Sequence, residues 1–370
     1  ATRDDKIACS DVTISDSTKV ESAAEYKDVY AYLEKYKKDQ ERDSAYTSSG
    51  ARSLNDIRVD ESADSKASGD TAQNAAADTG MASGSYSETN VRQEGVDEGD
   101  TAKTDGTYLY VLKDKSDQIA IIDTRDNRMK QTATITVEDV SEIQEMYLDI
   151  ERNQLIAVCD GYVGGKWNDD DYGYGQRGNT TAVTYDISDR ADPKEVGRVS
   201  QSGYYNSSRI ADGYLYLFSD YYVTLDGITA KNPKSYIPLV NDNLIKETDI
   251  CLPSISKADM YSIITSVSLE NPNETAHSKA LLADGGNLYV SNDNIYFYEN
   301  VWQYSGKDVT TIRKVSYESG KLTAGAQCKI DGYINDSFSI DEYDGYLRVV
   351  VTDGDTNSVY VLDQELKETG

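Results

Sequence analysis

A tight turn followed by a short strand recurs along this sequence and decides its fold. The first copy reads Asp105-Gly106-Thr107-Tyr108-Leu109-Tyr110. Further copies are Asn153-Gln154-Leu155-Ile156-Ala157-Val158, Asp212-Gly213-Tyr214-Leu215-Tyr216, Asp284-Gly285-Gly286-Asn287-Leu288-Tyr289 and Asp344-Gly345-Tyr346-Leu347-Arg348. Asp-Gly favours a type I′ hairpin turn, because both central residues need a positive φ. The alternating apolar residues after each turn predict a half-buried strand.

A second strand unit, ending in a polar residue and a turn, follows each copy of the first unit. Its copies are residues 119–123, 182–186, 264–269, 311–317 and 359–363. The first units begin at 105, 153, 212, 284 and 344, at spacings of 48, 59, 72 and 60 residues. A propeller blade is four strands in about 40–50 residues, so five two-part repeats predict an all-β propeller with loop insertions. A β-sandwich is the competing fold, but it would not explain the constant order of the two units.

The chain divides into three regions by composition. Residues 1–40 form an N-terminal helical segment, in which a helix is predicted over 20–38 from the apolar stripe and from the capping-box pattern of Ser22 and Glu25. Residues 41–85 are rich in Ser, Ala, Asp, Gly and Thr and predict a low-complexity linker. Residues 86–370 carry the repeats and form the propeller domain.

Charge narrows the classes of partner. The 370 residues include 65 acids, 37 bases and one His, which gives a net charge of −28. This excess of acidic residues argues against a nucleic acid as the partner, because binding its phosphates needs clustered Lys and Arg. It also argues against binding to an anionic membrane surface. A single His excludes multi-His metal sites. No apolar run approaches the length of a transmembrane segment, so none is predicted in this chain.

The N-terminus and the cysteines give information on the cellular compartment of the protein. The chain begins at Ala1 without a hydrophobic signal core, so a signal peptide is absent from this chain. The acidic, Tyr- and Ser-rich composition favours a secreted or cell-envelope protein. The four cysteines, Cys9, Cys159, Cys251 and Cys328, form no C-x-x-C motif. The four cysteines could form two disulfides, in any of three pairings, or they could be buried free thiols. The sequence does not decide between these alternatives.

Several motifs carry a family resemblance. The stretch Ser87-Glu88-Thr89-Asn90-Val91-Arg92-Gln93-Glu94-Gly95-Val96-Asp97-Glu98-Gly99-Asp100 resembles the opening motif of the bacterial and archaeal secreted proteins that contain a C-terminal β-propeller domain. Further matches are Tyr185-Asp186-Ile187-Ser188-Asp189, Ser207-Ser208-Arg209, Tyr289-Val290-Ser291 and the segment 338–349. The resemblance covers most of 86–370 and implies an exported protein, often tethered to the cell envelope. It implies no established activity and no catalytic residues.

One departure from the family concerns the end of the domain. The family continues beyond the segment 359–363 with further strands, whereas this chain stops at Gly370. We therefore expect the propeller ring to be incomplete here or to close differently. An unclosed ring leaves strand edges that invite pairing with another chain.

Ligand-binding candidates come from aromatic and arginine side chains. Gly173-Tyr174-Gly175-Gln176-Arg177-Gly178 matches G-x-G-x-x-G, but it follows three aspartates and precedes a strand, which argues against a dinucleotide site. In the same insertion, Trp167, Tyr172 and Tyr174 could stack on sugars or partner side chains. Arg209 and Arg348 lie near repeat strands, where internal charge pairing competes with anion binding.

Two acidic clusters are candidates for calcium, although no cofactor is required by any motif. Asp353, Asp355 and Asn357 form D-x-D-x-N, but Ser358 and Gln364 replace the glycine and glutamate of an EF-hand loop. Asp97, Glu98 and Asp100, with Asp105 nearby, form the second cluster. Solvated turns and capping roles are the competing interpretation of both.

These observations favour a cell-surface binding or scaffold module that contacts a protein or a carbohydrate. The alternatives are a carbohydrate-active hydrolase that uses a carboxylate pair and a subunit of a larger extracellular assembly. A hydrolase would need two carboxyl groups about 5–10 Å apart, at least one with a raised pKa. A binding module would instead present an exposed aromatic patch. The single His277, after Asn271-Pro272, is predicted to be a surface residue.

Overall fold

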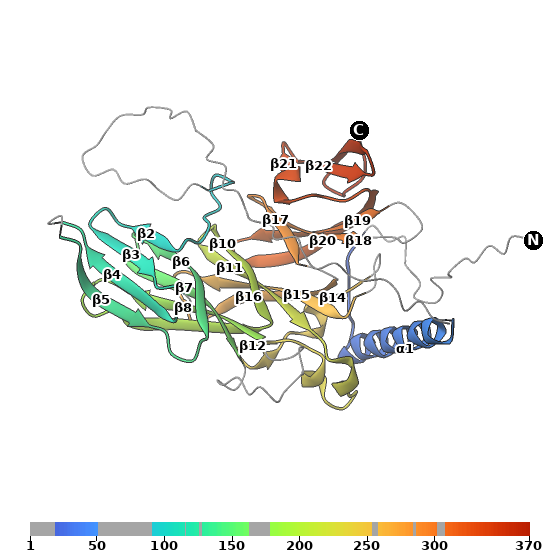
Figure 1. Ribbon diagram of the computed structural model, residues 1–370, viewed down its shortest axis with the longest axis horizontal. Coiled ribbons are helices and arrows are strands. Elements are labelled where there is room, and N and C mark those ends of the chain that lie inside the picture. The colour runs from blue at the N-terminus through green and yellow to red at the C-terminus, as the bar shows by residue number, and fades with distance from the viewer. Residues whose placement is uncertain are drawn as a thin grey trace, which may run out of the picture.

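The computed structural model describes residues 19–50, 91–114, 116–125, 128–162, 178–253, 258–283, 286–301 and 308–370. Within these residues it has one α-helix, four short 3-10 helices and 23 strands arranged in five sheets. Figure 1 shows the sheets following one another in chain order, with the first at one end of the molecule and the fifth at the other. The all-β fold predicted from the repeats is confirmed.

The first two sheets contain the strands between residues 102 and 202. The first sheet has the order β2 (Ala102–Thr104), β3 (Tyr108–Leu112), β4 (Gln118–Asp123) and β5 (Lys130–Thr136). The second runs from β6 (Glu142–Asp149) through β7 (Gln154–Tyr162) and β8 (Gly178–Asp186) to β9 (Lys194–Ser202), and is extended by β12 (Leu239–Val240) and β13 (Asn243–Leu244). All of these strand pairs are antiparallel.

The third sheet combines strands from the middle of the chain with one short strand from its N-terminal segment. It contains β10 (Tyr204–Ala211), β11 (Tyr214–Tyr222), β15 (Met260–Ser268) and β16 (Thr275–Ala283), then β14 (Ile250–Leu252) and β1 (Glu21–Ser22). The pairing of β14 with β16 is parallel. The 3-10 helices η1 (Leu225–Gly227), η2 (Pro233–Ser235) and η3 (Glu247–Asp249) lie in the connection from β11 to β14.

The last two sheets complete the series. The fourth contains β17 (Asn287–Val290), β18 (Asn294–Val301), β19 (Val309–Glu318) and β20 (Lys321–Asp331). The fifth contains β21 (Ile340–Tyr343), β22 (Tyr346–Asp353) and β23 (Thr356–Leu362), and is preceded by η4 (Ser337–Ser339). The final residues run along β23, where Val361 N donates to Gly370 O and Thr369 N donates to Val361 O, both at 2.8 Å.

The repeated turns join the first and second strands of four sheets. In the third sheet Asp212 and Gly213 have φ of 50° and 76°, and in the fifth Asp344 and Gly345 have 50° and 77°. These values fit the type I′ turn that Asp-Gly predicts. The predicted second units coincide with the third strand of each sheet, β4, β8, β15, β19 and β23.

The fourth copy of the unit is followed by a strand as predicted, but it occupies a different position in its sheet. The strand after 284–286 is β17, the first of its sheet, so this copy does not occupy the position of the others. The turn that joins the first and second strands is instead at residues 291–293, where Ser291 N donates to Asn294 O at 2.8 Å. The Asp284-Gly285-Gly286 motif and residues 291–293 both precede an alternating Tyr-rich run in the sequence, and only the strand pairing distinguishes the two positions.

Successive residues of a strand in the inner sheets point to opposite faces of the sheet and so lie in two different hydrophobic cores. Each inner sheet therefore packs on a sheet on either side. Leu155 and Ala157 of β7 lie in the core between the first and second sheets, whereas Ile156 and Val158 lie in the core between the second and third. The same alternation separates the third–fourth core from the fourth–fifth core. Burial of each aliphatic side chain contributes about 1.5–3 kcal/mol. Among the described residues, no core joins the fifth sheet to the first.

The helix α1 (Tyr26–Gly50) packs its Val29 and Leu33 into the core of the second and third sheets. It begins later than predicted, because Glu21 and Ser22 pair as a strand with β14. Ser22 therefore does not cap it. The carboxylate of Asp28 accepts hydrogen bonds from the backbone of Ala24 and Glu25, at 3.2 and 2.9 Å. The helix continues to Gly50, into the predicted linker of residues 41–85, and residues 51–85 of that linker lie outside the described residues.

Candidate functional site

Residues 91–101, which we call the strap, run across the innermost strands of successive sheets. Arg92 donates to Ile340 O of the fifth sheet at 2.5 Å and stacks on Tyr289 of the fourth. Asp97 exchanges backbone hydrogen bonds with Ile210 of the third sheet. Asp100 then pairs with Met146 of the second sheet. The strap thus ties four sheets together before the chain enters the first, and most of it is the motif that carries the family resemblance.

The predicted acidic cluster of the strap is occupied by internal partners. Asp97 lies 3.5 Å from the ammonium group of Lys103, and Glu98 lies 3.4 Å from Arg209. Asp100 accepts a hydrogen bond from Thr101 N at 2.7 Å. Of the two roles predicted for Arg209, the structure shows charge pairing, and its Nη1 also donates to Ser207 and to the carbonyl of Ser208.

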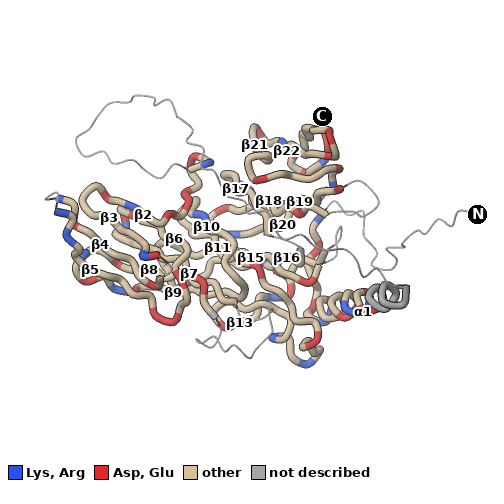
Figure 2. The backbone as a smooth tube through the Cα atoms, in the orientation of Figure 1, with Lys and Arg blue, Asp and Glu red and all other residues tan. Residues whose placement is uncertain are grey.

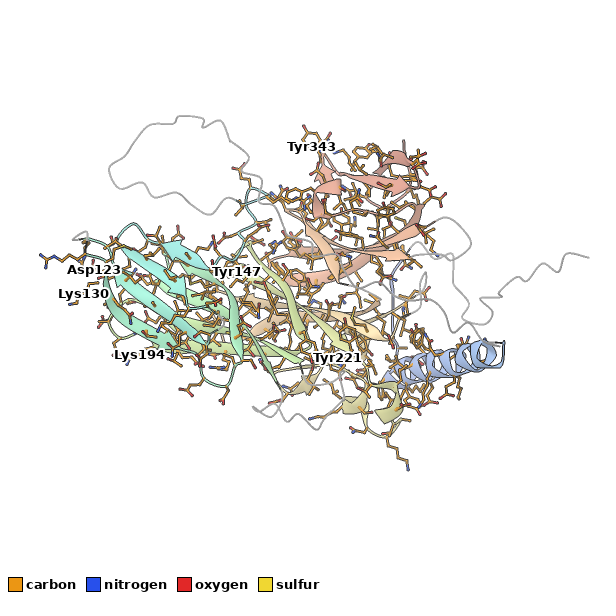
Figure 3. The ribbon with its side chains drawn as sticks, in the orientation of Figure 1. Asp123, Lys130, Tyr147, Lys194, Tyr221 and Tyr343 are labelled. Atoms are coloured by element: carbon orange, nitrogen blue, oxygen red, sulfur yellow. The ribbon has the colours of Figure 1, made fainter. Side chains whose placement is uncertain are left out.

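Beneath the strap, Glu145 is the acceptor at the centre of a polar cluster. Its carboxylate accepts from Tyr147, at 3.0 Å, and from Ser208. Tyr147 and Ser208 are also 2.9 Å from each other, and Figure 3 labels Tyr147 near the middle of the molecule, between the second and third sheets. A Cβ at Gly99 would lie 2.2 Å from the Glu145 carboxyl carbon, so any larger residue there would force this carboxylate to move.

A polar groove of about 810 Å³ opens between the third, fourth and fifth sheets. Four acidic residues line it, Asp212, Asp293, Glu318 and Glu342, together with Lys314 and Lys321. It lies where the first-to-second strand turns of these three sheets gather, beside Gly95 of the strap. Its volume is within the range of about 300–1,000 Å³ that is usual for ligand sites.

Hydrogen bonds fix the floor of this groove. The carboxylate of Glu342 accepts from Asn294 at 2.9 Å and from Ser291. Ser316 donates to the Asn294 amide oxygen at 2.7 Å, and Tyr317 donates to Ser291 O at 2.6 Å. These bonds hold the fourth and fifth sheets together, whereas the side chains of Asp293 and Glu318 are on exposed residues at the rim. The groove therefore offers exposed carboxylates on a prearranged polar base.

Two partly buried carboxyl groups lie around the start of β10. Asp160 accepts from the backbone of Tyr205 at 2.7 Å, and Asp220 accepts from Asn206 at 2.6 Å. Burial raises the pKa of both carboxyl groups, although these hydrogen bonds oppose the shift. The sequence did not single out either residue, because its many acids hide which of them are buried.

Arg348 lies on the exposed outer face of the fifth sheet. It pairs with Asp341 and lies over the ring of Tyr343, 4.9 Å from its centroid. Tyr343 is 67% exposed and neighbours Tyr346, its strand partner. Figure 3 labels Tyr343 at the outer edge of β21. An exposed aromatic patch was the feature expected of a binding module.

The D-x-D-x-N motif forms a hairpin turn. Asp353 and Thr356 pair at the ends of β22 and β23, Gly354 has a φ of 58°, and Asn357 accepts from Thr352 at 2.9 Å. In the described part of the chain, no three His, Cys, Asp or Glu side chains are grouped so that they could hold a metal ion. Calcium binding by Asp353, Asp355 and Asn357 stays a prediction.

The remaining candidates have different outcomes. Trp167, Tyr172 and Tyr174 lie outside the described residues. His277 was expected at the surface, but it is half-buried in β16, where its Nε2 is 3.0 Å from Asp249 and its Nδ1 accepts from Leu322 N. Its ring bridges the third and fourth sheets. Among the described residues, no helix has the length and apolar character needed to cross a membrane.

Comparison with known proteins agrees with this architecture. Residues 86–370 match the Beta propeller domain family, and the chain belongs to that family. It is similar to an uncharacterized protein of Methanocaldococcus jannaschii, with 23% identity over 368 residues that cover 77% of this chain and 54% of the relative. A second uncharacterized protein, from Archaeoglobus fulgidus, is 34% identical over 95 residues, which cover 25% of this chain and 15% of the relative.

The chain spans about half the length of the first of these relatives and less of the second. Among solved structures, it is similar to Kuenenia stuttgartiensis hydrazine synthase, with 12% identity, a TM-score of 0.34, and coverage of 70% of this chain and 62% of the other. It is also similar to the WD40 domain of Toxoplasma gondii coronin, with 9% identity, a TM-score of 0.33, and coverage of 70% and 54%. Likeness at this level carries no argument about activity.

Proposed function

We propose that this protein is an exported binding module at the cell surface, and that the polar groove contacts its ligand. The ligand is a protein segment or a carbohydrate that presents cationic or hydroxyl groups. The observation that carries this proposal is the groove itself, which joins three sheets and combines four acidic residues with two lysines. Carboxylates accept hydrogen bonds from ammonium, guanidinium and hydroxyl donors, and charged acceptors make the stronger bonds.

The rim of the groove suits recognition because it needs little rearrangement. Asp293 and Glu318 are exposed, whereas Glu342 and Asn294 below them are held by internal hydrogen bonds. A ligand would replace water at the rim without breaking the contacts between the sheets. The net charge of −28 would also attract a cationic partner over a distance that shortens as salt is added.

Co-sedimentation with cell-envelope fractions, in calcium and in EDTA, tests the proposal. We expect the wild-type protein to bind and the Asp293→Asn, Glu318→Gln double variant to bind at least about tenfold more weakly, which corresponds to about 1.4 kcal/mol. Asp242→Asn with Glu270→Gln is the matched control, because it removes two exposed carboxylates away from the groove. An equal loss of binding in both double variants would show that the net charge of the protein causes the binding, and that the groove does not. Calcium dependence would direct attention to Asp353 and Asp355.

The proposed location has its own test. Protease added to intact cells that produce the protein should cleave it, because a surface module is accessible from outside. Complete protection on intact cells, with cleavage after lysis, would contradict export to the surface.

A hydrolase is the second candidate, and the raised pKa values of Asp160 and Asp220 are the observation that favours it. A carboxyl group whose pKa is raised holds its proton to a higher pH, which is the direction that a general acid needs. Asp160→Asn and Asp220→Asn should each abolish any release of reducing sugar from envelope polysaccharide. Absence of such release from the wild-type protein would remove this candidate and leave the binding module untouched.

A further inference from the structure

The polar groove concentrates negative charge from three sheets, and its effect reaches the phenols beside it. Burial raises the pKa of Tyr317, which lines the groove. Among the groups that raise this pKa further are three acids of the same groove, Asp212, Asp293 and Glu342. Burial also raises the pKa of Tyr296, and Glu342 and Asp293 add to that shift. Acids from the third, fourth and fifth sheets therefore act on one small region.

The two lysines of the groove do not cancel this charge. Lys314 Nζ donates to the carbonyl of Gln364, at 2.5 Å, and Lys321 is the strand partner of Glu318 at the rim. Four acids and two lysines leave two negative charges in excess. Acidic positions are also spread along all the sheets (Figure 2), so a ligand approaches the groove through a field that is negative overall.

The hydrogen bonds of the floor distinguish a cationic ligand from a sugar. Asn294 donates to Glu342 at 2.9 Å, and Ser316 donates to the Asn294 amide oxygen at 2.7 Å. Tyr317 donates to Ser291 O at 2.6 Å. These three donors of the floor are engaged within the protein, whereas each carboxylate of the groove can accept several bonds. A sugar hydroxyl both donates and accepts, but ammonium and guanidinium groups only donate, as this lining requires.

The aromatic content of the groove leads to the same distinction. Tyr317 is the one aromatic residue among the described residues that line it. Its side chain is 5% exposed, and its ring packs against Tyr216 with the centroids 4.6 Å apart. The ring is therefore part of the core and offers no open face on which a sugar could stack.

We propose that the ligand of the groove is a short basic protein segment, whose arginine or lysine side chains bind the exposed carboxylates of Asp293 and Glu318. This inference rests on the proposed function of the groove and narrows its ligand to one class. Guanidinium presents its donors in a planar fork that can bind a carboxylate through two parallel hydrogen bonds, so arginine should bind more tightly than lysine. Charge complementarity selects the partner, and the volume of about 810 Å³ limits the segment to a few residues.

Calorimetric titration of the full chain with a capped hexapeptide of alternating arginine and glycine tests this inference. We expect binding, and we expect the same peptide with citrulline in place of arginine to bind at least about tenfold more weakly, because citrulline keeps N–H donors but has no charge. The Asp293→Asn, Glu318→Gln double variant should lose a similar factor for the arginine peptide. The Asp242→Asn, Glu270→Gln control should stay within about twofold of the wild type, because salt screens charges far from the groove.

A lysine variant should change the affinity in the opposite direction. Lys321→Gln removes a like charge from the rim, so the arginine peptide should bind roughly two- to fivefold more tightly. Lys329→Gln is the matched control, because Lys329 is an exposed lysine of the same strand, β20, and lies outside the groove. A neutral ligand would not distinguish the two variants. Unchanged or weaker binding of the peptide to Lys321→Gln would contradict the inference.

Failure of this inference can be told apart from failure of the proposed function. Chitohexaose, a neutral oligosaccharide, is the comparison probe. If chitohexaose binds and the groove double variant loses it, while the arginine peptide does not bind, the groove is a ligand site but its ligand is not a basic segment. If the peptide binds equally to the groove variant and to its control, net charge explains the binding and the inference is wrong. If the groove variant also keeps full binding to envelope fractions, the proposed function fails with it.

Discussion

The backbone of Asp97 exchanges two hydrogen bonds with Ile210, at 2.8 and 3.0 Å. This pair attaches the strap to the inner edge of the third sheet, where a lone strand edge would otherwise leave its amide and carbonyl groups unpaired. Val96, beside Asp97, is buried in the core of the third and fourth sheets. The strap is therefore a structural tie as well as the wall of the groove, and changes in it should affect stability before they affect binding.

Gly99→Ala should lower the free energy of unfolding by about 1–3 kcal/mol. The new Cβ would lie 2.2 Å from the carboxyl carbon of Glu145 and would push that carboxylate away from Tyr147 and Ser208. Urea unfolding measures the change. Gly227→Ala is the control, because nothing lies within 4 Å of a Cβ there, and it should cost no more than about 0.5 kcal/mol.

A double-mutant cycle identifies the cause of that loss. In a Glu145→Ala background the clash is absent, so Gly99→Ala should cost much less than in the wild-type protein. Equal cost in both backgrounds would show that Gly99 is needed for the path of the strap and not for the position of Glu145.

Asp105→Asn should destabilise the protein most at neutral pH. Burial works against ionisation of Asp105, but hydrogen bonds from Tyr108 N and Thr107 N, and from Arg190 and Tyr110, outweigh it and hold its pKa below the ordinary value. A lowered pKa in the folded state adds stability above the unfolded-state pKa of about 3.9, and this stability is lost as the pH falls through the folded-state value. The difference between wild type and variant, about 1–3 kcal/mol at pH 7, should therefore shrink below about pH 4. A difference that does not change between pH 7 and pH 3 would contradict this account.

Asp220→Asn should show the opposite dependence on pH. Burial raises the pKa of Asp220, against the hydrogen bonds from Asn206 and Ser262, so the folded state keeps the proton to a higher pH than the unfolded state does. Stability of the wild-type protein then falls as the pH rises from about 4 through the folded-state pKa. The variant lacks this titration, so its stability relative to wild type should rise with pH over the same window. Urea midpoints at several pH values measure the difference, and parallel curves would contradict it.

The sequence predicted the strands well because their evidence is local. Asp212-Gly213 and Asp344-Gly345 need only their own backbone angles to form a turn, and the alternation after them marks the two faces of a strand. The same evidence does not distinguish the Asp284-Gly285-Gly286 motif from residues 291–293, because both precede a Tyr-rich strand in the sequence. Only hydrogen bonding between strands shows which of them opens the hairpin.

The candidate site was less predictable because it depends on contacts between distant segments. The strap has few apolar residues and no periodicity, so nothing local indicates that Arg92 reaches Ile340 or that Glu98 meets Arg209. The groove combines acids from three sheets, and a chain with 65 acids gives no means of choosing among them. For Arg348, the sequence placed the residue near a repeat strand and offered charge pairing as one of two roles. It did not identify the partner, because the pairing with Asp341 follows from the register of β21 and β22.

The described cysteines should be unreactive in the folded protein. Cys159, Cys251 and Cys328 are free thiols, and burial raises the pKa of Cys251 to about 11 and that of Cys328 to about 12. Because the thiolate is the reactive form, a Cys9→Ser variant should not react with a thiol reagent until it unfolds, and should then take up three equivalents. Fast labelling of the folded variant would show that one of these thiols is accessible. Failure to label after unfolding would reveal a disulfide.

Arg313→Met should cause the largest loss of stability among these variants. Arg313 Nη1 donates to Glu299 Oε1 at 2.8 Å, and both side chains are 1% exposed. Removing the guanidinium takes its positive charge away from the buried Glu299 carboxylate, and the Thr311 hydroxyl that donates to Glu299 carries no charge to replace it. A broken buried pair costs about 3–5 kcal/mol, whereas replacement of both partners by apolar residues is often close to neutral. The Arg313→Met, Glu299→Met double variant should therefore be more stable in urea than Arg313→Met alone. If the double variant is the less stable of the two, the pair contributes net attraction beyond its desolvation cost, and the fourth sheet depends on it.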